Sequence, residues 1–434
     1  MSQILHKHMS VFVQSVIRSS SSNSDFQVYK KACFSRIVIL ILQYFFNLII
    51  PDHVSEDAFQ TKIETSFAFE GLCRWDSQYF IEIATNGYSH DYFTVFFPGF
   101  PILVKTLSEF IRIDVQLTGL FLNNFVFFPW AAVFVRQLER KLKTEESWNS
   151  KISAADLFIL SPANIFFSSF YTESMFAFST FGMLVFLDSN NGNLFFALVF
   201  ALISQITRSN GIVNIGFFLY RIGESIFVNR QTTFNRVFKI CVCCVIQCLP
   251  FLFYQKYVSD KFCSSGSSSP GWCQNRNSFT GFTFSYGHFQ TNVWENGFMR
   301  YWQLKKIPNF LLFAPTLFFS EINHKLWISN SISLSFYFFR LTYSVRKSVK
   351  IIFSNELFMY GFHLKFLVLY CLCFMHIEVG SRLIMSSTPI FYLCYSEIDH
   401  KYRVSSMFSN LFCKFSILYT FLGLILHTNW YPWT

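Results

Sequence analysis

Charge is scarce in this chain of 434 residues. Charged side chains make up 14% of it, whereas roughly 25% is usual for a soluble domain. Hydrophobic residues make up 52%, and they gather in runs too long and too numerous for soluble cores. The net charge of +10 comes from Lys and Arg clustered in short loops, as the positive-inside rule expects. We therefore predict a membrane protein in contact with lipids, and no nucleic-acid partner.

Several familiar signals are also missing. Residues 1–33 are Ser-rich and basic but lack the small-residue cleavage site of a signal peptide. No paired C-x-x-C motifs or other zinc-ligand spacings occur, so we predict no metal site. We find no internal repeat of the inverted-transporter kind. These absences leave the apolar runs and the residues between them as the guide to the fold.

The apolar runs predict an all-α multi-pass membrane protein with about eleven spans. The first run, 36–50, ends at Pro51 and is typical of a signal-anchor helix whose basic flank, including Arg36, stays cytosolic. Two shorter segments, 76–86 and 98–111, are amphipathic or interfacial. The remaining spans are predicted at 116–135, 153–169, 171–187, 193–207, 212–228, 239–256, 308–322, 357–377, 386–395 and 411–427. The apolar segment 325–339 is badly placed for a full span, and we assign it no role.

This topology predicts two parts of unequal size. Residues 1–35 form a cytosolic N-terminus, and residues 36–434 form one transmembrane domain with lumenal loops at 52–115 and 257–307. The C-terminus is then lumenal. The same topology brings five carboxylates and three arginines to the lumenal side or its interface, where we predict an active site. The residues concerned are Asp76, Glu82, Asp91, Glu173, Glu295, Arg208, Arg300 and Arg382.

Two of the twelve cysteines lie close together in one long polar segment. Cys263 and Cys273 lie in the polar segment FCSSGSSSPGWC. An oxidising lumen permits a disulfide between them, which closes a flexible loop. Two free thiols are the alternative. Most other cysteines lie within spans, where they act as small apolar residues.

Seven blocks in order along the chain carry a resemblance to a known family. They are RWDSQYFIEIATNGY…FFPGFP (74–101), SPANIFFSSFYTESMFAFSTFG (161–182), RSNGIVNIGF (208–217), FCSSGSSSPGWC (262–273), NGFMRYWQLKKIPNFLLFAP (296–315), HIEVGSRLIMSSTPIFY (376–392) and LHTNWYPWT (426–434). Together they resemble the PIG-V family of GPI mannosyltransferases. The main departure is Asp91, where the family usually has Glu.

The resemblance implies a GT-C-type glycosyltransferase of the endoplasmic reticulum membrane. Such an enzyme takes mannose from dolichol-phosphate-mannose and adds the second mannose of the GPI precursor through an α-1,6 bond. Donor and acceptor are its substrates, no cofactor is expected, and a small membrane partner subunit is compatible. Because a β-linked donor gives an α-linked product, the reaction inverts the anomeric carbon. Inversion requires a base on the acceptor hydroxyl and stabilisation of the departing phosphate.

We predict that Asp76, which follows Trp75 on the first lumenal loop, is the base, and we group Trp75 with the substrate-binding residues. The alternative is that Asp76 caps the helix that follows. Glu173 is the second catalytic candidate, to orient the acceptor or polarise Asp76. Its alternatives are a helix cap or an ion pair with Arg208. Asp91 is predicted to bind the acceptor, with a solvated loop carboxylate as the alternative, and Glu82 is predicted to be solvated.

Arg208 and Arg382 are the predicted phosphate ligands, since a guanidinium offers a fork of donors. Pairing with carboxylates or snorkelling to the interface is the alternative for both. Asn210 belongs to the R-S-N-G turn that places Arg208. Two other function classes stay open: another lumenal dolichol-dependent transferase, or a non-catalytic membrane subunit or transporter. A transporter usually places its charges at mid-membrane in broken helices, whereas here they gather at one face.

Overall fold

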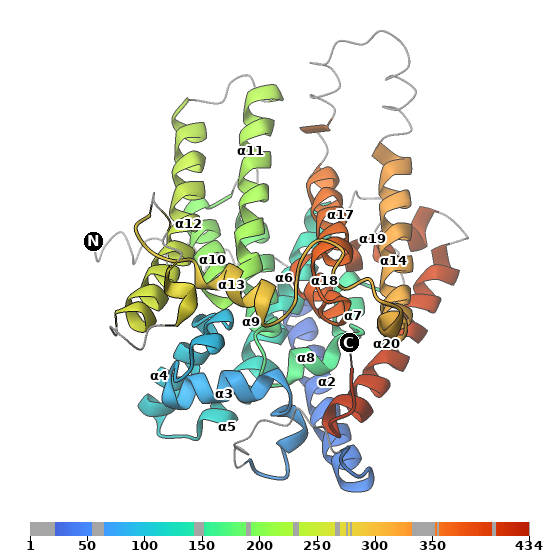
Figure 1. The fold of residues 1–434 in the computed structure, drawn as a ribbon. Coiled ribbons are helices and arrows are strands. Elements are labelled where there is room, and N and C mark those ends of the chain that lie inside the picture. Colours follow the sequence, from blue (N-terminus) through green and yellow to red (C-terminus); the bar gives the residue numbers. More distant parts are fainter. Residues whose placement is uncertain are drawn as a thin grey trace.

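A computed structural model describes most of the chain. The described residues are 22–53, 65–142, 152–187, 192–228, 234–264, 270–274, 277, 280–331, 352–353, 356–401 and 405–433. They form helices and connecting loops, and no strand is found among them (Figure 1). The all-α prediction is therefore confirmed for this part of the chain.

The N-terminal half begins with one long helix and continues with shorter ones. Its elements are α2 (Ser22–Ile49), η1 (Glu70–Leu72), α3 (Asp76–Asn86), η2 (Asp91–Val95), α4 (Gly99–Ile111), α5 (Val115–Phe121), the π-helical turn η3 (Leu122–Phe127), α6 (Phe128–Leu142), α7 (Ala154–Ile159), α8 (Asn164–Ser168), α9 (Glu173–Phe186), α10 (Leu194–Thr207), η5 (Ser209–Asn214) and α11 (Ile215–Phe227).

The C-terminal half contains the longest helix and ends with another long one. Its elements are α12 (Phe234–Cys263), η7 (Gly271–Gln274), α13 (Ser285–Asn292), η8 (Leu304–Lys306), α14 (Ile307–Ser331), α17 (Glu356–Phe374), η9 (Ile377–Val379), α18 (Gly380–Ser387), α19 (Ile390–Lys401) and α20 (Ser405–Thr428). The unassigned segment 325–339 begins within α14, and its residues from 332 onward lie outside the described part of the chain.

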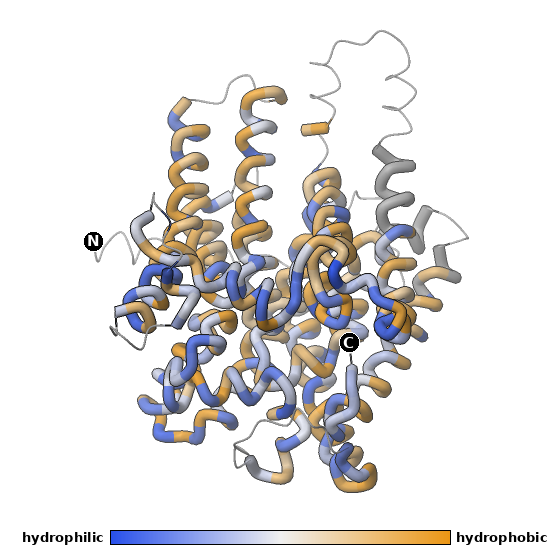
Figure 2. The backbone as a smooth tube through the Cα atoms, in the orientation of Figure 1, coloured by the Kyte–Doolittle hydropathy of each residue, from blue (hydrophilic) through white to orange (hydrophobic). Residues whose placement is uncertain are grey.

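Long and short helices occupy different levels of the molecule. In Figure 1, α11, α12, α14 and α17 extend through the upper half, while the short helices α3, α4, α5 and α8 lie in the lower half. The upper parts of α11 and α12 are mainly hydrophobic, and hydrophilic residues are frequent in the lower half (Figure 2). The first loop, with Asp76 at the start of α3, is thus part of the more polar level.

In the part of the chain that the structure describes, five helical stretches are long and apolar enough to cross a membrane. They are Ser24–Ile49, Val115–Leu142, Phe234–Cys263, Glu356–Phe374 and Asn410–Thr428. The helices Glu173–Phe186 and Leu194–Thr207 are apolar but shorter. A multi-pass membrane protein is therefore supported, whereas the larger number of about eleven spans stays a prediction.

Proline breaks two of the predicted spans. The run 153–169 divides into α7 and α8 at Pro162, and the run 386–395 divides into α18 and α19 at Pro389. Thr388 has extended φ and ψ angles of −133° and 122°, as expected for a residue before proline. Proline also lacks the N–H that would continue the helix. Both breaks leave short helices, and one of them, α18, carries Arg382.

The first helix differs from its prediction at its start. Helix α2 begins at Ser22 rather than at residue 36, so it crosses the predicted boundary between residues 35 and 36. Arg36 is not part of an exposed basic flank, because its side chain is fully buried. It donates to Asn164 Oδ1 at 2.7 Å and Ser168 Oγ at 2.9 Å, and it lies 3.8 Å above the Phe128 ring. Arg36 therefore fastens α2 to α8.

Phenylalanine fills much of the core between these helices. Phe128, Phe158 and Phe167 come from α6, α7 and α8, and their ring centroids lie 4.8–5.4 Å apart. Such aromatic pairs contribute about 0.5–1.5 kcal/mol each beyond the area that they bury. Packing of these aromatic rings therefore stabilises the short helices α7 and α8 against α6.

Candidate active site

The predicted base follows a strained turn. Trp75 has φ 58° and ψ −131°, in the half of φ/ψ space that favours glycine. A larger residue in such a conformation costs about 1–3 kcal/mol, which surrounding contacts have to offset. Trp75 is the N-cap of α3 and makes no side-chain cap, and Asp76 is the first helical residue. The alternative in which Asp76 caps the helix is therefore wrong.

The carboxylate of Asp76 binds an arginine from the far end of the chain. Asp76 Oδ2 accepts a hydrogen bond of 2.7 Å from an Nη of Arg382, on α18. The Asp76 side chain keeps 33% of its surface exposed, against 14% for Arg382. Burial by itself lowers the pKa of the Arg382 guanidinium, but the charges of Asp76 and Glu173 raise it above its ordinary value. Arg382 is therefore a permanent cation beside Asp76.

Glu173 links this pair to a second arginine. At the start of α9 its side chain is fully buried, and its Oε1 forms an ion pair and hydrogen bond with Arg208. The same oxygen lies 3.8 Å from Arg382 Nε. Arg208 also donates to Thr172 Oγ1 at 3.1 Å. The ion-pair alternative for Glu173 is thus present in the structure, and Asp76, Arg382, Glu173 and Arg208 form one cluster of two anions and two cations, which we call the charge cluster.

The R-S-N-G turn sets the position of Arg208. Arg208 ends α10 in an extended conformation, and η5 begins at the next residue. A Cβ on Gly211 would lie 2.6 Å from the Ser204 carbonyl oxygen, so the turn packs against α10 as only glycine allows. Asn210 donates to Ser387 Oγ at 3.1 Å, which ties η5 to α18. Asn210 therefore joins the elements that carry Arg208 and Arg382.

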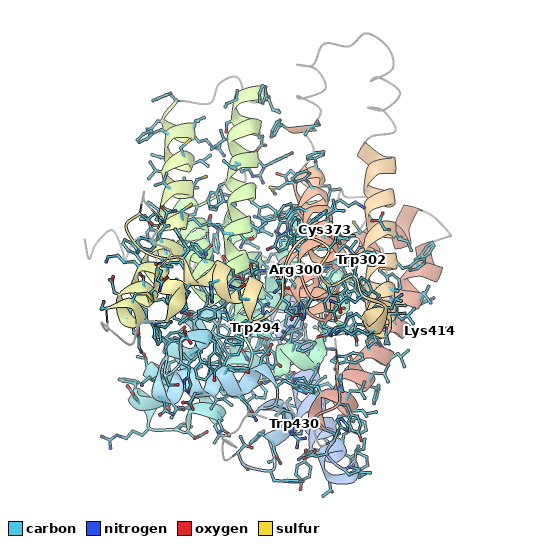
Figure 3. The ribbon with its side chains drawn as sticks, viewed as in Figure 1. Trp294, Arg300, Trp302, Cys373, Lys414 and Trp430 are labelled. Atoms are coloured by element: carbon cyan, nitrogen blue, oxygen red, sulfur yellow. A yellow bond between two sulfur atoms is a disulfide. The ribbon has the colours of Figure 1, made fainter. Side chains whose placement is uncertain are left out.

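The C-terminal residues close the back of the first loop. Trp430 lies 5.5 Å from Trp75 between ring centroids and 5.6 Å from the Arg74 guanidinium (Figure 3). His427, near the end of α20, contacts both the Gly71 carbonyl oxygen and the Tyr171 hydroxyl. Sequence reasoning missed Arg74, Tyr171 and His427, although each lies in a quoted block, because none of them carries a signal beyond its residue type.

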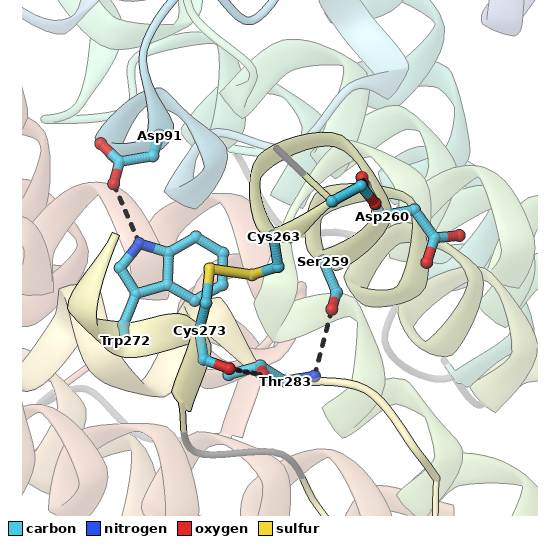
Figure 4. Close-up of a disulfide and its surroundings, with 8 residues drawn as sticks. Asp91, Ser259, Asp260, Cys263, Trp272, Cys273 and Thr283 are labelled. Atoms are coloured by element: carbon cyan, nitrogen blue, oxygen red, sulfur yellow. Dashed lines mark hydrogen bonds between the residues drawn. A yellow bond between two sulfur atoms is a disulfide. The ribbon is translucent and has the colours of Figure 1, made fainter. Parts of the chain in front are cut away.

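Asp91 lies in a different environment. Its Oδ2 accepts a hydrogen bond of 2.9 Å from Trp272 Nε1 (Figure 4). Cys263 and Cys273 form a disulfide next to Trp272, which is the pairing predicted from the loop. Trp272 and Cys273 pack into an apolar group separate from the main core, and we call this region the disulfide cluster; its buried members are Ile83, Tyr88, Phe93, Phe97, Tyr254, Val258, Trp272, Cys273 and Phe289.

Other polar groups stand apart from the charge cluster. Glu82 lies at the surface of α3, where its Oε1 accepts from Asn86 at 3.0 Å, in keeping with a solvated residue.

The loop before α14 is anchored to α17, since Met299 N donates to the Cys373 carbonyl and Trp302 Nε1 to that of Leu372 (Figure 3). Within the described ranges, no three His, Cys, Asp or Glu side chains are grouped as metal ligands.

Comparison with known proteins decides the family. A family model described as Mannosyltransferase (PIG-V) matches residues 25–434. This chain belongs to the PIG-V mannosyltransferase family. The predicted family and enzyme class are therefore confirmed, and the alternatives of a transporter and a non-catalytic subunit are set aside.

PIG-V relatives match over nearly their whole length. GPI alpha-1,6-mannosyltransferase 2 of Cricetulus griseus is 27% identical, over 95% of this chain and 99% of that protein. GPI mannosyltransferase 2 of Drosophila pseudoobscura pseudoobscura is 29% identical, over 94% and 99%. GPI mannosyltransferase 2 of Schizosaccharomyces pombe is 28% identical, over 95% and 86%. The similarity thus covers every block that contributes to the charge cluster.

Four PIG-V blocks meet at this one place in the fold. Asp76 comes from the first block, Glu173 from the second, Arg208 from the third and Arg382 from the sixth. Hydrogen bonds and ion pairs connect all four side chains. The charge cluster is therefore the candidate active site of this PIG-V mannosyltransferase.

Proposed function

We propose that this protein adds an α-1,6-linked mannose to the GPI precursor at the lumenal face of the endoplasmic reticulum membrane. The donor in this proposal is dolichol-phosphate-mannose, and the acceptor is the precursor that already carries one mannose. Full-length similarity to proteins named GPI alpha-1,6-mannosyltransferase 2 supports the linkage and the acceptor. The observation that carries the chemistry is the ion pair between Asp76 and Arg382, with Glu173 and Arg208 behind it.

Asp76 has the geometry of a general base. Oδ2 is held by Arg382, while Oδ1 accepts no hydrogen bond from any described residue and the side chain is a third exposed. In the proposed step the acceptor oxygen attacks C1 of the mannose, and the bond from C1 to the phosphate oxygen breaks. The phosphate leaves with the bonding electron pair, and the hydroxyl proton passes to Asp76. A base of this kind contributes typically 10²–10⁴-fold to the rate.

The two arginines have donors to spare for the phosphate. The charge cluster is neutral by itself, so an arriving phosphodiester needs N–H groups that the carboxylates do not occupy. A guanidinium has five N–H donors, and Arg382 spends one of them on a hydrogen bond to Asp76. Arg208 is 17% exposed and lies on the other side of Glu173. We propose that both bind the departing phosphate and that Glu173, which is fully buried, holds them in place without touching the sugars.

The remaining predicted residues have supporting roles in this proposal. Trp75 borders the site as part of the turn before Asp76, and we propose that it contacts a sugar ring. Asn210 holds η5 to α18 and acts through Arg208. The acceptor-binding role of Asp91 stays a prediction, since its carboxylate oxygen is engaged by Trp272.

Rescue of cells that lack the second GPI mannosyltransferase tests the proposal. Wild type, Asp76→Asn and Glu82→Gln are compared at equal protein level for surface GPI-anchored protein and for the one-mannose lipid intermediate. We expect wild type and Glu82→Gln to clear the intermediate, and Asp76→Asn to leave it. Glu82 is the matched control because it is a surface carboxylate on the same helix. Rescue by Asp76→Asn would exclude Asp76 as the base, and failure of wild type would contradict the proposed function.

A further inference from the structure

A chain of buried polar groups runs from the last helix to the backbone of Asp76. His427 Nδ1 lies 3.2 Å from the Gly71 carbonyl oxygen, and His427 Nε2 lies 3.4 Å from the Tyr171 hydroxyl. The N–H of Asp76 donates to the same hydroxyl at 3.1 Å. His427 and Tyr171 are 1% and 2% exposed. Water therefore has almost no access to the chain.

The chemistry of the partners fixes the direction of each hydrogen bond. A carbonyl oxygen only accepts, so His427 Nδ1 carries a proton and donates to Gly71. The Tyr171 oxygen accepts from the Asp76 N–H, and its own proton then points to His427 Nε2. A neutral His427 is then the Nδ1–H tautomer, and among the neutral forms only this one satisfies all three links together.

This chain of polar groups reaches the start of α3, where the helix has no side-chain cap of its own. The first N–H groups of a helix have no partner within it, and the N-cap residue Trp75 supplies no side-chain bond. The Tyr171 hydroxyl replaces the missing cap, because it accepts the hydrogen bond from the Asp76 N–H. Behind it, a Cβ on Gly71 would lie 2.2 Å from Thr428 Cγ2, so the end of α20 presses directly on the first loop.

We propose that Tyr171 and His427 are positioning residues that hold the Asp76 carboxylate at the reacting centre. The inference rests on the proposed function, in which Asp76 is the base. It gives neither residue a part in proton transfer, because the chain ends at the Asp76 backbone N–H and not at the carboxylate. A base misplaced by about 1 Å loses about 100-fold in rate, so the effect is expected in kcat.

Tyr171→Phe is the first test, in microsomes that contain the full-length protein. Phe keeps the ring that packs against Phe166 and removes only the hydroxyl. We expect kcat for mannosyl transfer to fall on the order of 10–100-fold, with KM for dolichol-phosphate-mannose changed less than about 2-fold. Tyr395→Phe is the matched control, since Tyr395 is fully buried and its hydroxyl donates to the Phe319 carbonyl at 2.8 Å. It is expected to lower thermal stability comparably and to leave kcat unchanged.

Two substitutions of His427 separate its two hydrogen bonds. In His427→Asn the amide N–H replaces Nδ1 and keeps the bond to Gly71, but it does not reach Tyr171. In His427→Gln the amide oxygen replaces Nε2 and keeps the bond to Tyr171. We expect His427→Gln to retain most of kcat and His427→Asn to fall toward Tyr171→Phe. Combining His427→Asn with Tyr171→Phe is expected to cost little more than Tyr171→Phe alone, because both break the same chain.

The outcomes distinguish the inference from the function on which it rests. If Tyr171→Phe lowers kcat no more than Tyr395→Phe, or if His427→Asn is as active as His427→Gln, the positioning role is wrong. If His427→Gln is not folded, the comparison of Tyr171→Phe with Tyr395→Phe still decides the matter. If the wild-type microsomes transfer no mannose, the proposed function fails before any variant is compared.

Discussion

Two aspartates of the same loop lie in contrasting surroundings. Asp76 is bound by the cation Arg382, which is 306 positions away in the chain, and it belongs to a cluster of four charges. Asp91 is bound by the neutral indole N–H of Trp272, in the disulfide cluster. The sequence offers both as acidic residues next to aromatic ones.

The difference separates the proposed base from a carboxylate whose role in binding the acceptor stays a prediction. At the charge cluster, each anion is paired with an arginine that has further N–H donors, and α3, α9 and α10 begin or end there. At the disulfide cluster, Asp91 accepts a hydrogen bond from the uncharged indole of Trp272. Packed aromatic rings and the disulfide stabilise this region. We therefore expect charge changes to act on catalysis in the first region and on local stability, weakly, in the second.

Removal of Arg382 gives the largest predicted effect. Arg382→Gln takes a partner from Asp76 and Glu173 and a donor from the phosphate, so kcat/KM for mannosyl transfer should fall about 10²–10³-fold. Arg382→Lys keeps the charge but loses the fork and should fall less, about 10-fold. Arg300→Gln is the control, since Arg300 is exposed and donates to the Thr291 carbonyl. Equal activity of Arg382→Gln and Arg300→Gln would contradict the phosphate role. The measurement is kcat/KM for mannosyl transfer in microsomes that are supplied with labelled donor.

Glu173→Gln should act first on stability. Its side chain is fully buried between Arg208 and Arg382, and loss of one member of a buried pair costs about 3–5 kcal/mol. We expect a lower melting temperature in detergent and less folded protein. Combining Glu173→Gln with Arg208→Gln should recover part of the loss, because no arginine charge is then left without its partner there. A double variant less stable than Glu173→Gln would mean that Arg208 is held by something else.

Local features of the sequence predicted a good part of this fold. The apolar runs indicated a helical membrane protein, and α3, α10 and α17 lie within a few residues of their predicted ranges. The breaks at Pro162 and Pro389 were missed, because the predicted spans ran across both prolines although proline disfavours a continuous helix. The start of α2 was also missed, because buried Arg36 looks like any loop arginine until Asn164 and Ser168 are placed beside it.

The candidate site was predictable as a set of residues but not as an arrangement. Family blocks pointed to Asp76, Glu173, Arg208 and Arg382, and no spacing within one block shows that these side chains meet. Their contacts depend on how α3, α9, η5 and α18 pack. His427 and the backbone N–H of Asp76 are linked through Tyr171, and neutral groups of this kind leave no charge pattern to detect.

Loss of the disulfide should affect the second region more than the first. Cys263→Ser opens a link that spans ten positions, and a loop of this size is worth about 3 kcal/mol in the chain-entropy model. We expect a lower melting temperature and a loss of the mobility difference between reduced and unreduced protein on gels. Activity at low temperature should fall only a few-fold. Cys241→Ser, which changes a free exposed cysteine, is the control and should match wild type. If Cys263→Ser lost as much activity as Arg382→Gln, the disulfide cluster would be needed for catalysis as well as for stability.

The smallest effect is predicted for Asp91→Asn, and it is the sharpest test of the contrast. The amide oxygen of Asn still accepts from Trp272 Nε1, so the hydrogen bond survives while the charge is removed. If Asp91 is structural, the rate of mannosyl transfer should stay within about 2-fold of wild type, because the hydrogen bond is kept and only the charge of a half-buried side chain has changed. The same substitution at position 76 removes the proposed base. A large rise in KM for the GPI precursor in Asp91→Asn, with KM for the donor unchanged, would instead assign Asp91 to the acceptor and extend the active site to the disulfide cluster.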